Sequence, residues 1–182
     1  MRGGDKLLER VENQPLVSLI CARAAATGLP VWVTLPRSDH PRAEWIGGAT
    51  PVIVADANDG MGASIRAGIA ALSDDIDAVM ILPADMPEIT QSDLCTLAQA
   101  VRFDDCAPIV RGASVDGKPG HPVVFPRSCF AALSRLSGDF GAREVVARHA
   151  HGVHLVALPD RHALTDLDTP EDWAEWRARG RR

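Results

Sequence analysis

The apolar and polar positions along the chain alternate in blocks that predict an α/β protein. Strands are predicted wherever a short apolar run is bounded by Pro, Gly or Asp, and these runs are residues 31–35, 51–55, 77–82 and 153–158. Helices are predicted where apolar residues recur at intervals of three to four, as in residues 15–27, 61–72, 90–101, 128–136, 139–149 and a terminal segment from 170. The run 77–82 is apolar without alternation, which is typical of a buried parallel strand covered by helices on both faces.

One segment interrupts this succession of strands and helices. The apolar runs 107–111 and 121–125 flank residues 112–120, in which Asp116-Gly117 is a strong hairpin signal. The whole pattern predicts a three-layer α/β domain over residues 1–182, with a mostly parallel sheet and an antiparallel hairpin insert.

Composition narrows the class of protein. A chain of 182 residues that is 46% hydrophobic is long enough for one domain with a core. Its net charge of -5, without a long basic stripe, argues against nucleic-acid binding. The sequence contains neither a leader pattern nor an apolar run of membrane-spanning length, so we expect a cytoplasmic protein. The four cysteines have no metal-ligand spacing.

Asp85 is the first candidate for chemistry. It follows the apolar run 77–82 and lies between Pro83 and Pro87, which end the strand and stiffen the turn. Ligands of open α/β sheets bind beyond the carboxyl ends of the strands, and a carboxylate there suits Mg²⁺ carrying a nucleotide phosphate. The alternative, at about even odds, is a turn aspartate that caps the next segment.

Further charged candidates lie near the two ends of the chain. Asp166 and Asp168 come directly before a helix that begins at Thr169-Pro170, and one of them could supply a second metal ligand. Acids favoured by the helix dipole are an equally good explanation. Lys6 follows two glycines and could place a point charge on a phosphate, or it could be a solvated terminal lysine.

The remaining candidates are glycine-rich. Gly60, Gly62 and Ser64 lie at a helix start, where free backbone N–H groups favour an anion, although a turn requirement is the commoner reason for such glycines. Gly120 and Pro122 enclose His121, and a lone histidine is usually not catalytic.

Several segments, in their order along the chain, resemble the molybdenum cofactor nucleotidyltransferase family, most closely its cytidylyltransferase branch. They are residues 2–8 (RGGDKLL), 60–64 (GMGAS), 83–87 (PADMP), 120–122 (GHP), 137–139 with 141–143 (SGD and GAR), and 166–172. The resemblance spans nearly the whole chain. It implies a Rossmann-like nucleotidyltransferase fold and transfer of CMP from CTP to the terminal phosphate of molybdopterin carrying molybdenum, with release of pyrophosphate.

The resemblance also implies residue roles. Asp85 and Asp168 would hold Mg²⁺, and Lys6 would act with Asp85 in catalysis by offsetting triphosphate charge. Gly62 and Ser64 would line the nucleotide, and His121 and Arg143 would lie toward the pterin phosphate. Gly60 and Gly120 would be further binding residues. The expected partners are CTP or GTP, the molybdenum cofactor and a molybdoenzyme of the xanthine dehydrogenase type. Alignment and charge neutralisation would drive such a transfer without a protein nucleophile.

The sequence departs from the family pattern at its start. Members begin with an apolar strand and a glycine-rich loop before the arginine, whereas this chain starts within that loop. We therefore expect a first strand to be missing and the edges of its neighbours to be exposed. Two alternatives follow: a noncatalytic module that binds the cofactor or a partner, and a related enzyme that uses GTP or a sugar phosphate.

Overall fold

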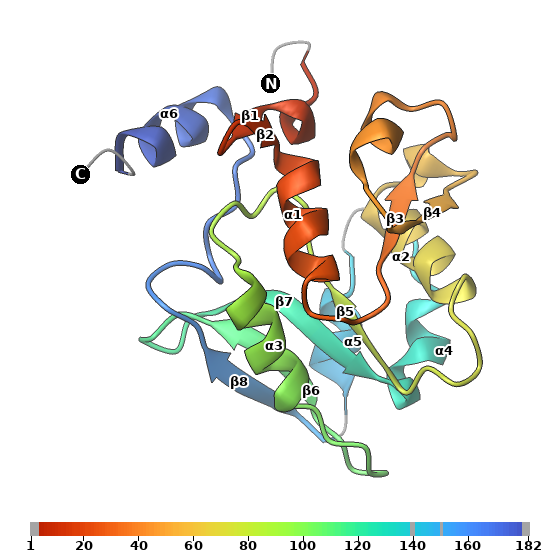
Figure 1. Ribbon diagram of the computed structural model, residues 1–182. Helices are drawn as coiled ribbons and strands as arrows, with labels where there is room; N and C mark the ends of the chain where they lie inside the picture. The colour runs from red at the N-terminus through yellow and green to blue at the C-terminus, as the bar shows by residue number, and fades with distance from the viewer. Residues whose placement is uncertain (1–3, 139–140, 150, 180–182) are drawn as a thin grey trace.

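The computed structural model describes residues 4–138, 141–149 and 151–179, which form helices on both faces of a central sheet (Figure 1). The sheet has the strand order β5 (Ala78–Ile81), β7 (Pro119–Pro126), β6 (Ile109–Ala113) and β8 (Val153–Ala157). β7 is antiparallel to both β5 and β6, and β8 is parallel to β6. Three strands thus share one direction and β7 alone is reversed, which confirms the predicted α/β class with its antiparallel insert.

The reversed strand comes from the predicted hairpin. Arg111 pairs with Val123 and Ala113 with Pro119, with a register shift between the two pairs. The turn closes through a hydrogen bond of 2.9 Å from the Gly117 amide to the Ser114 carbonyl oxygen, and Gly117 has a φ of +83°. A residue without Cβ adopts this φ at little cost, so the Asp-Gly signal correctly located the turn.

Alternating side chains of the sheet divide the core into two layers. Val123 and Phe125 pack with Ile65 of α2 (Met61–Ala70) and with residues near α4 (Phe130–Leu133) and α5 (Arg143–Arg148). Val124 packs on the other face with Leu94 and Leu97 of α3 (Gln91–Gln99), beside α1 (Leu16–Ala25). Because successive side chains of a strand point to opposite faces, each face of the sheet packs against its own helices, which gives the order helices, sheet, helices.

Strand β5 is less buried than its sequence predicts. All four of its residues are half-buried, whereas the unbroken apolar run predicted a covered strand. The reason is its position, since within the described residues β5 pairs with β7 alone. β3 (Trp32–Leu35) and β4 (Thr50–Ile53) form a separate parallel pair.

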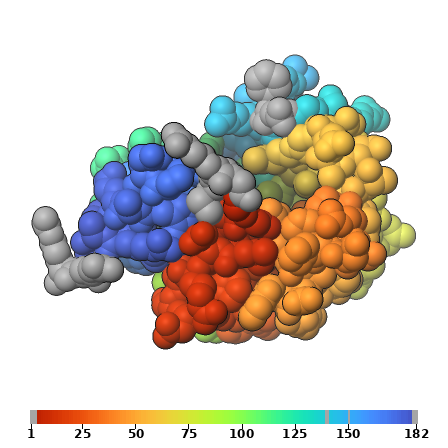
Figure 2. Space-filling model, turned by 90° about the horizontal axis from the view of Figure 1, so that it is seen from above, coloured from red at the N-terminus to blue at the C-terminus, as the bar shows by residue number. Residues whose placement is uncertain are grey.

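The N-terminal segment lies beside the C-terminal helix α6 (Figures 1 and 2). A short hairpin of β1 (Arg10–Val11) and β2 (Gln14–Pro15), which the sequence did not predict, follows the 3-10 helix η1 (Lys6–Leu8). It shares an apolar cluster with α6 (Pro170–Arg179), whose Trp173 is buried. The smaller helical turns are η2 (Pro41–Trp45), η3 (Ala57–Asp59) and η4 (Arg127–Cys129). None of the described helices has the length and apolar character needed to cross a membrane.

Candidate active site

The ammonium group of Lys6 lies between two carboxylates from distant parts of the chain. Its Nζ atom is 2.5 Å from Asp85 Oδ2 and 2.5 Å from Asp168 Oδ1. These partners are 79 and 162 residues away from Lys6 in the sequence. Three residues that were singled out separately therefore meet at one point beyond the carboxyl end of β5, where ligands of such sheets bind.

Buried neighbours hold the turn that carries Asp85. The side chains of Met86 and Ile89 are 1% and 0% exposed, so the turn is anchored in the core directly after the acid. One guanidinium nitrogen of Arg23 donates hydrogen bonds of 2.7 Å to the carbonyl oxygens of Pro87 and Ile89. These bonds satisfy backbone acceptors that the turn leaves unpaired, and they fix its shape.

The segment that carries Asp168 is tied to this same turn. The Leu167 amide donates a hydrogen bond of 3.1 Å to the carbonyl oxygen of Asp85. The Thr165 hydroxyl donates to the Glu88 carboxylate over 2.7 Å. The relative position of the two acids is thus set by bonds between their own segments as well as by Lys6.

Asp5 and Arg42 position Lys6. The Asp5 carboxylate accepts bonds of 2.7 and 2.8 Å from Nε and Nη2 of Arg42, and it caps η1 through the Leu7 amide at 3.1 Å. Burial alone would raise the pKa of Asp5, but its bonds to Arg42 and Leu7 outweigh burial and lower it. Burial alone would lower the pKa of Lys6, and the bonds to Asp168 and Asp85 raise it instead. Lys6 is therefore an ammonium ion at neutral pH.

The donor set fits a magnesium ion that also carries a nucleotide. Oδ1 of Asp85 is buried without a hydrogen-bond partner among the described residues, so one acceptor of the pair is unused. Asp85 Oδ2 and Asp168 Oδ1 both lie at the Lys6 ammonium, so the two carboxylates that would hold a hard cation already face one positive charge. The described residues contain no group of three or more His, Cys, Asp or Glu able to hold a metal. Asp85 and Asp168 would therefore hold Mg²⁺ together with phosphate oxygens and water, since Mg²⁺ is commonly bound by one or two carboxylates plus substrate phosphates.

The predicted glycine segment lies at the start of α2. Gly60, with a φ of +77°, precedes the helix, and the Gly62 amide donates a 3.0 Å hydrogen bond to the Gly138 carbonyl oxygen. A Cβ at position 62 would come within 2.9 Å of that oxygen, so only glycine fits this approach. Ser64 is half-buried in the first turn. Within the described residues, no hydrogen bond joins Gly60, Gly62 or Ser64 to Lys6 or the two acids, and their nucleotide role stays a prediction.

Gly120 and His121, both in β7, contact Ala163 in the segment that leads to Asp168. The His121 amide donates a 2.8 Å bond to the Ala163 carbonyl oxygen, and a Cβ on Gly120 would meet the same oxygen at 1.9 Å. Burial and then the positive charge of Arg111 lower the pKa of His121, while the negative charge of Asp85 acts in the opposite direction. His121 is accordingly a neutral imidazole at pH 7, between a basic group and the acidic centre.

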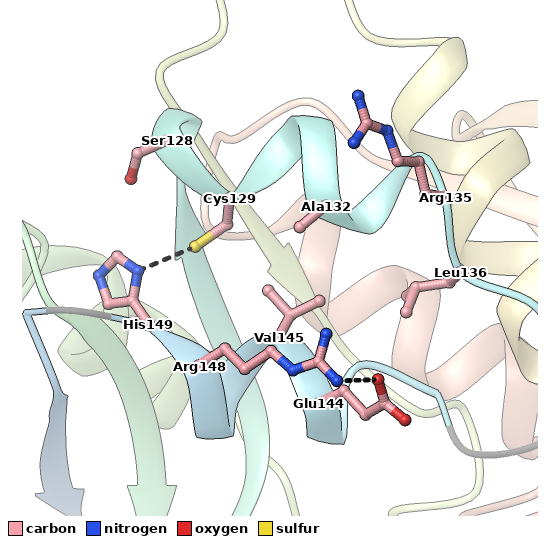
Figure 3. A pocket seen from close by; sticks show the side chains of 9 residues that line it. All are labelled: Ser128, Cys129, Ala132, Arg135, Leu136, Glu144, Val145, Arg148 and His149. Carbon is pink, nitrogen blue, oxygen red and sulfur yellow. Dashed lines mark hydrogen bonds and ion pairs between the residues drawn. The ribbon is translucent and has the colours of Figure 1, made fainter.

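A cavity away from these acids lies between α4 and α5 and holds a cysteine and a histidine (Figure 3). It has a volume of about 400 Å³, and Cys129 Sγ lies 3.4 Å from His149 Nδ1. His149 Nε2 lies 2.9 Å from the carbonyl oxygen of Ala107, which can only accept a hydrogen bond. Burial raises the pKa of the Cys129 thiol. A raised pKa favours the thiol form of Cys129, which argues against a thiolate nucleophile.

Sequence reasoning missed four residues that shape the candidate site. Arg23, Arg42, Glu88 and Arg111 are partly exposed charged residues within ordinary helix, loop or strand patterns. The only local signal was for Glu88, which directly follows the Pro-Ala-Asp-Met-Pro segment. Their partners lie far away in the sequence, so contacts such as Asp5 with Arg42 required the fold.

The fold is that of the nucleotidyltransferases. Rv0371c from Mycobacterium tuberculosis H37Rv superposes with a TM-score of 0.80, with 23% identity over 96% of this chain and 89% of that chain. The same mycobacterial protein has been solved in complex with manganese. A CMP:2-keto-3-deoxy-manno-octonic acid synthetase complexed with CTP superposes with a TM-score of 0.72 and 15% identity, covering 97% of this chain and 91% of that one.

Sequence comparison is more specific. Residues 1–153 match the model of the MobA-like NTP transferase domain, so the chain belongs to this family. A relative in Bacillus subtilis (strain 168), purine catabolism protein PucB, is 28% identical over 183 residues, which are 94% of this chain and 87% of the relative.

Proposed function

We propose that this protein is a magnesium-dependent cytidylyltransferase that transfers CMP from CTP to the molybdopterin form of the molybdenum cofactor. The observation that carries the proposal is the Lys6 ammonium held at 2.5 Å from both Asp85 and Asp168. One cation and two hard anionic ligands at the sheet edge are the groups needed to hold a metal–triphosphate complex.

The reaction requires positioning more than covalent chemistry. A phosphate oxygen of the acceptor forms a bond to the α-phosphorus of CTP, the bond from that phosphorus to the bridging oxygen breaks, and pyrophosphate leaves. Asp85 and Asp168 would hold Mg²⁺, which neutralises charge on the triphosphate as it develops. Lys6 would turn from the carboxylates toward the phosphates and keep its proton, because its pKa is raised.

Two relatives support the choice of nucleotide and acceptor. A protein of the same fold has been solved with CTP, and the cytidylyltransferase branch is the one that this chain most resembles. The Bacillus subtilis relative is named for purine catabolism, which agrees with a receiving molybdoenzyme of the xanthine dehydrogenase type, since xanthine is a purine. GTP and sugar phosphates are the competing substrates.

The test is pyrophosphate release from CTP, GTP or ATP in the presence of molybdenum cofactor, with Mg²⁺ or with a chelator. We expect release from CTP that requires Mg²⁺ and falls about 100-fold or more in Asp85→Asn, because a neutral amide binds the cation poorly. Asp105→Asn is the matched control, since Asp105 is an exposed carboxylate in the loop before β6.

Three outcomes would contradict this proposal. Undiminished turnover in Asp85→Asn would show that this carboxylate does not hold the metal. Faster pyrophosphate release from GTP than from CTP would identify GTP as the substrate nucleotide. Cofactor binding without any pyrophosphate release would favour a noncatalytic module.

A further inference from the structure

Strand β8 leaves one edge of the central sheet open. Within the described residues it pairs with β6 alone, in a regular parallel register that runs from Val153 beside Ile109 to Ala157 beside Ala113. Natural sheets protect such an edge with charged side chains, proline or a bulge. The exposed strand β4 contains Pro51, which has no N–H to donate, whereas β8 (VHLVA) contains neither proline nor an Asp, Glu, Lys or Arg. The β8 edge can therefore accept another strand.

The backbone of β8 presents alternate residues to this edge. The Gly152 carbonyl oxygen accepts a 3.2 Å hydrogen bond from β6, and the Leu158 amide donates a 2.8 Å hydrogen bond to β6. In a parallel strand the amide and the carbonyl group of one residue point to the same side, and successive residues alternate between the two sides. The amides and carbonyl groups of Val153, Leu155 and Ala157 therefore point away from β6, toward the open edge.

The same residues form an apolar stripe at the surface. Val153 and Leu155 are 38% and 40% exposed, whereas Ile109, the β6 neighbour of Val153, is fully buried in the core layer that contains Val145 of α5. Ala157 is exposed on the same face of the sheet. The helical cover of this face thus ends at β6, and the apolar groups of β8 would be stabilised by a further surface that covers them.

A second copy of this chain fits the edge, because β8 is complementary to itself. If a two-fold axis passes through Leu155, the antiparallel register places Leu155 opposite its symmetry mate and Val153 opposite Ala157 of the second copy. Every residue in these pairs directs its amide and carbonyl group outward, so each pair can exchange both hydrogen bonds. His154 and Val156 of the two copies then face each other at the positions without hydrogen bonds.

The charges at the ends of β8 agree with antiparallel pairing. The exposed side chain of His151 precedes the strand, and the exposed carboxylate of Asp160 follows it. Asp160 has a φ of +44°, which ends the extended strand before Arg161. The two-fold arrangement brings the imidazole of one copy beside the carboxylate of the other, where it can donate a hydrogen bond or carry a compensating charge. No like charges meet along the strand itself, which matters between two chains of net charge -5.

We propose that β8 is a homodimer interface, in which two copies of the chain join their central sheets by antiparallel pairing about Leu155. The sheet would then continue from β5, β7, β6 and β8 of one copy into β8, β6, β7 and β5 of the other. The Lys6–Asp85–Asp168 site follows β5, which is the other outer strand of this sheet. The inference therefore goes beyond the proposed function and does not depend on it. Because two short strands bury a small area, we expect a dimer that dissociates at micromolar concentrations.

The first test is sedimentation equilibrium of the full chain between about 10 and 500 μM. We expect the mass to rise from one chain toward two with concentration, and the dissociation constant to rise at least about tenfold in Leu155→Lys, because two ammonium groups then meet across the axis. Val115→Lys is the matched control, since Val115 is a 73% exposed apolar residue in the turn between β6 and β7 and should change the constant less than about twofold. A single-chain mass at every concentration, or an equally stable dimer of Leu155→Lys, would overturn the inference.

The second test uses amide hydrogen exchange of the wild-type chain, which requires no substitution. The amides of Val153, Leu155 and Ala157 should exchange at least about tenfold more slowly at high than at low protein concentration. Those of His154 and Val156, which face β6, should exchange at a rate independent of concentration. Outward amides that are protected equally at all concentrations would show that another part of the same chain covers the edge, and this result would refute the dimer.

Discussion

At the scale of single residues, Lys6 has two linked tasks. Its ammonium compensates Asp85 and Asp168, whose like charges would otherwise repel each other. The same group is the cation we expect to move to the triphosphate when a divalent ion takes its place. A flexible four-carbon stem permits this exchange, which a rigid guanidinium would not.

The raised pKa of Lys6 predicts a loss of stability at alkaline pH. Because the folded state holds this proton more tightly than the unfolded chain, its contribution is complete below the unfolded value of 10.5 and disappears as the pH rises through the folded value. The chain has no tyrosine, but its thiols also titrate in this range, and burial raises the pKa of Cys21 to about 11, so the comparison with Lys6→Met is needed to isolate the share of Lys6. Urea unfolding between about pH 9 and pH 11.5 should therefore show a steeper loss in wild type than in Lys6→Met.

Lys118→Met provides the comparison for this measurement. It removes an exposed lysine and should leave the steep wild-type dependence unchanged. If Lys6→Met retained the full wild-type slope, the bonds from Lys6 to the two acids would not persist in solution.

At the scale of elements, the start of α2 depends on a close backbone approach. Gly62 lies against the carbonyl oxygen of Gly138, where a Cβ would be only 2.9 Å away. Gly68, in the same helix, has room for a methyl group, because a Cβ added there would meet Thr34 Cγ2 at 3.8 Å, an ordinary van der Waals distance. Gly62 is therefore required by a close backbone contact, whereas at Gly68 an alanine would change only the helix propensity.

Substitution of these two glycines should have opposite effects. Gly68→Ala should stabilise the protein by about 0.5–1 kcal/mol, because alanine loses less backbone entropy in a helix. Gly62→Ala should destabilise it and weaken CTP binding, because backbone atoms must move apart at the end of α2 that we assign to the nucleotide. Thermal unfolding and CTP titration of both variants provide the comparison. Equal stabilisation by both substitutions would show that the approach of Gly138 is dispensable.

Local sequence signals predicted the start of α3 and the strand β5, but they did not predict how far a strand is buried, because burial depends on how many strands pair with it. Thr90 and Asp93 form the expected capping box of α3, with both reciprocal hydrogen bonds present. The apolar run of β5 correctly predicted a strand but not its half-burial, because the number of neighbouring strands is not encoded in the run itself. Arg111 gave no signal, since its isolation from the described carboxylates is a property of the folded sheet.

At the scale of the whole molecule, both ends of the chain converge on the turn after β5. Figure 2 shows the N-terminal segment beside the C-terminal helix α6. Glu88 accepts hydrogen bonds from Thr165 and from the indole nitrogen of Trp176 in α6, at 2.7 and 3.1 Å. Because its acids come from positions 85 and 168, the candidate metal site is stabilised only when these distant segments have folded together. The residue pattern around each acid suggested a separate candidate ligand, and only the family resemblance placed Asp85 and Asp168 at one metal site.

The measurement that tests the central claim most directly is calorimetric titration of the protein with CTP, GTP and ATP, each with and without Mg²⁺, in wild type and Asp85→Asn. We predict that CTP binds wild type about tenfold tighter than GTP or ATP, that this binding requires Mg²⁺, and that Asp85→Asn abolishes the Mg²⁺ requirement together with the tight binding. A folded wild-type protein that binds none of the nucleotides, or that binds CTP equally well without Mg²⁺, would contradict the assignment of Lys6, Asp85 and Asp168 as a metal–nucleotide site.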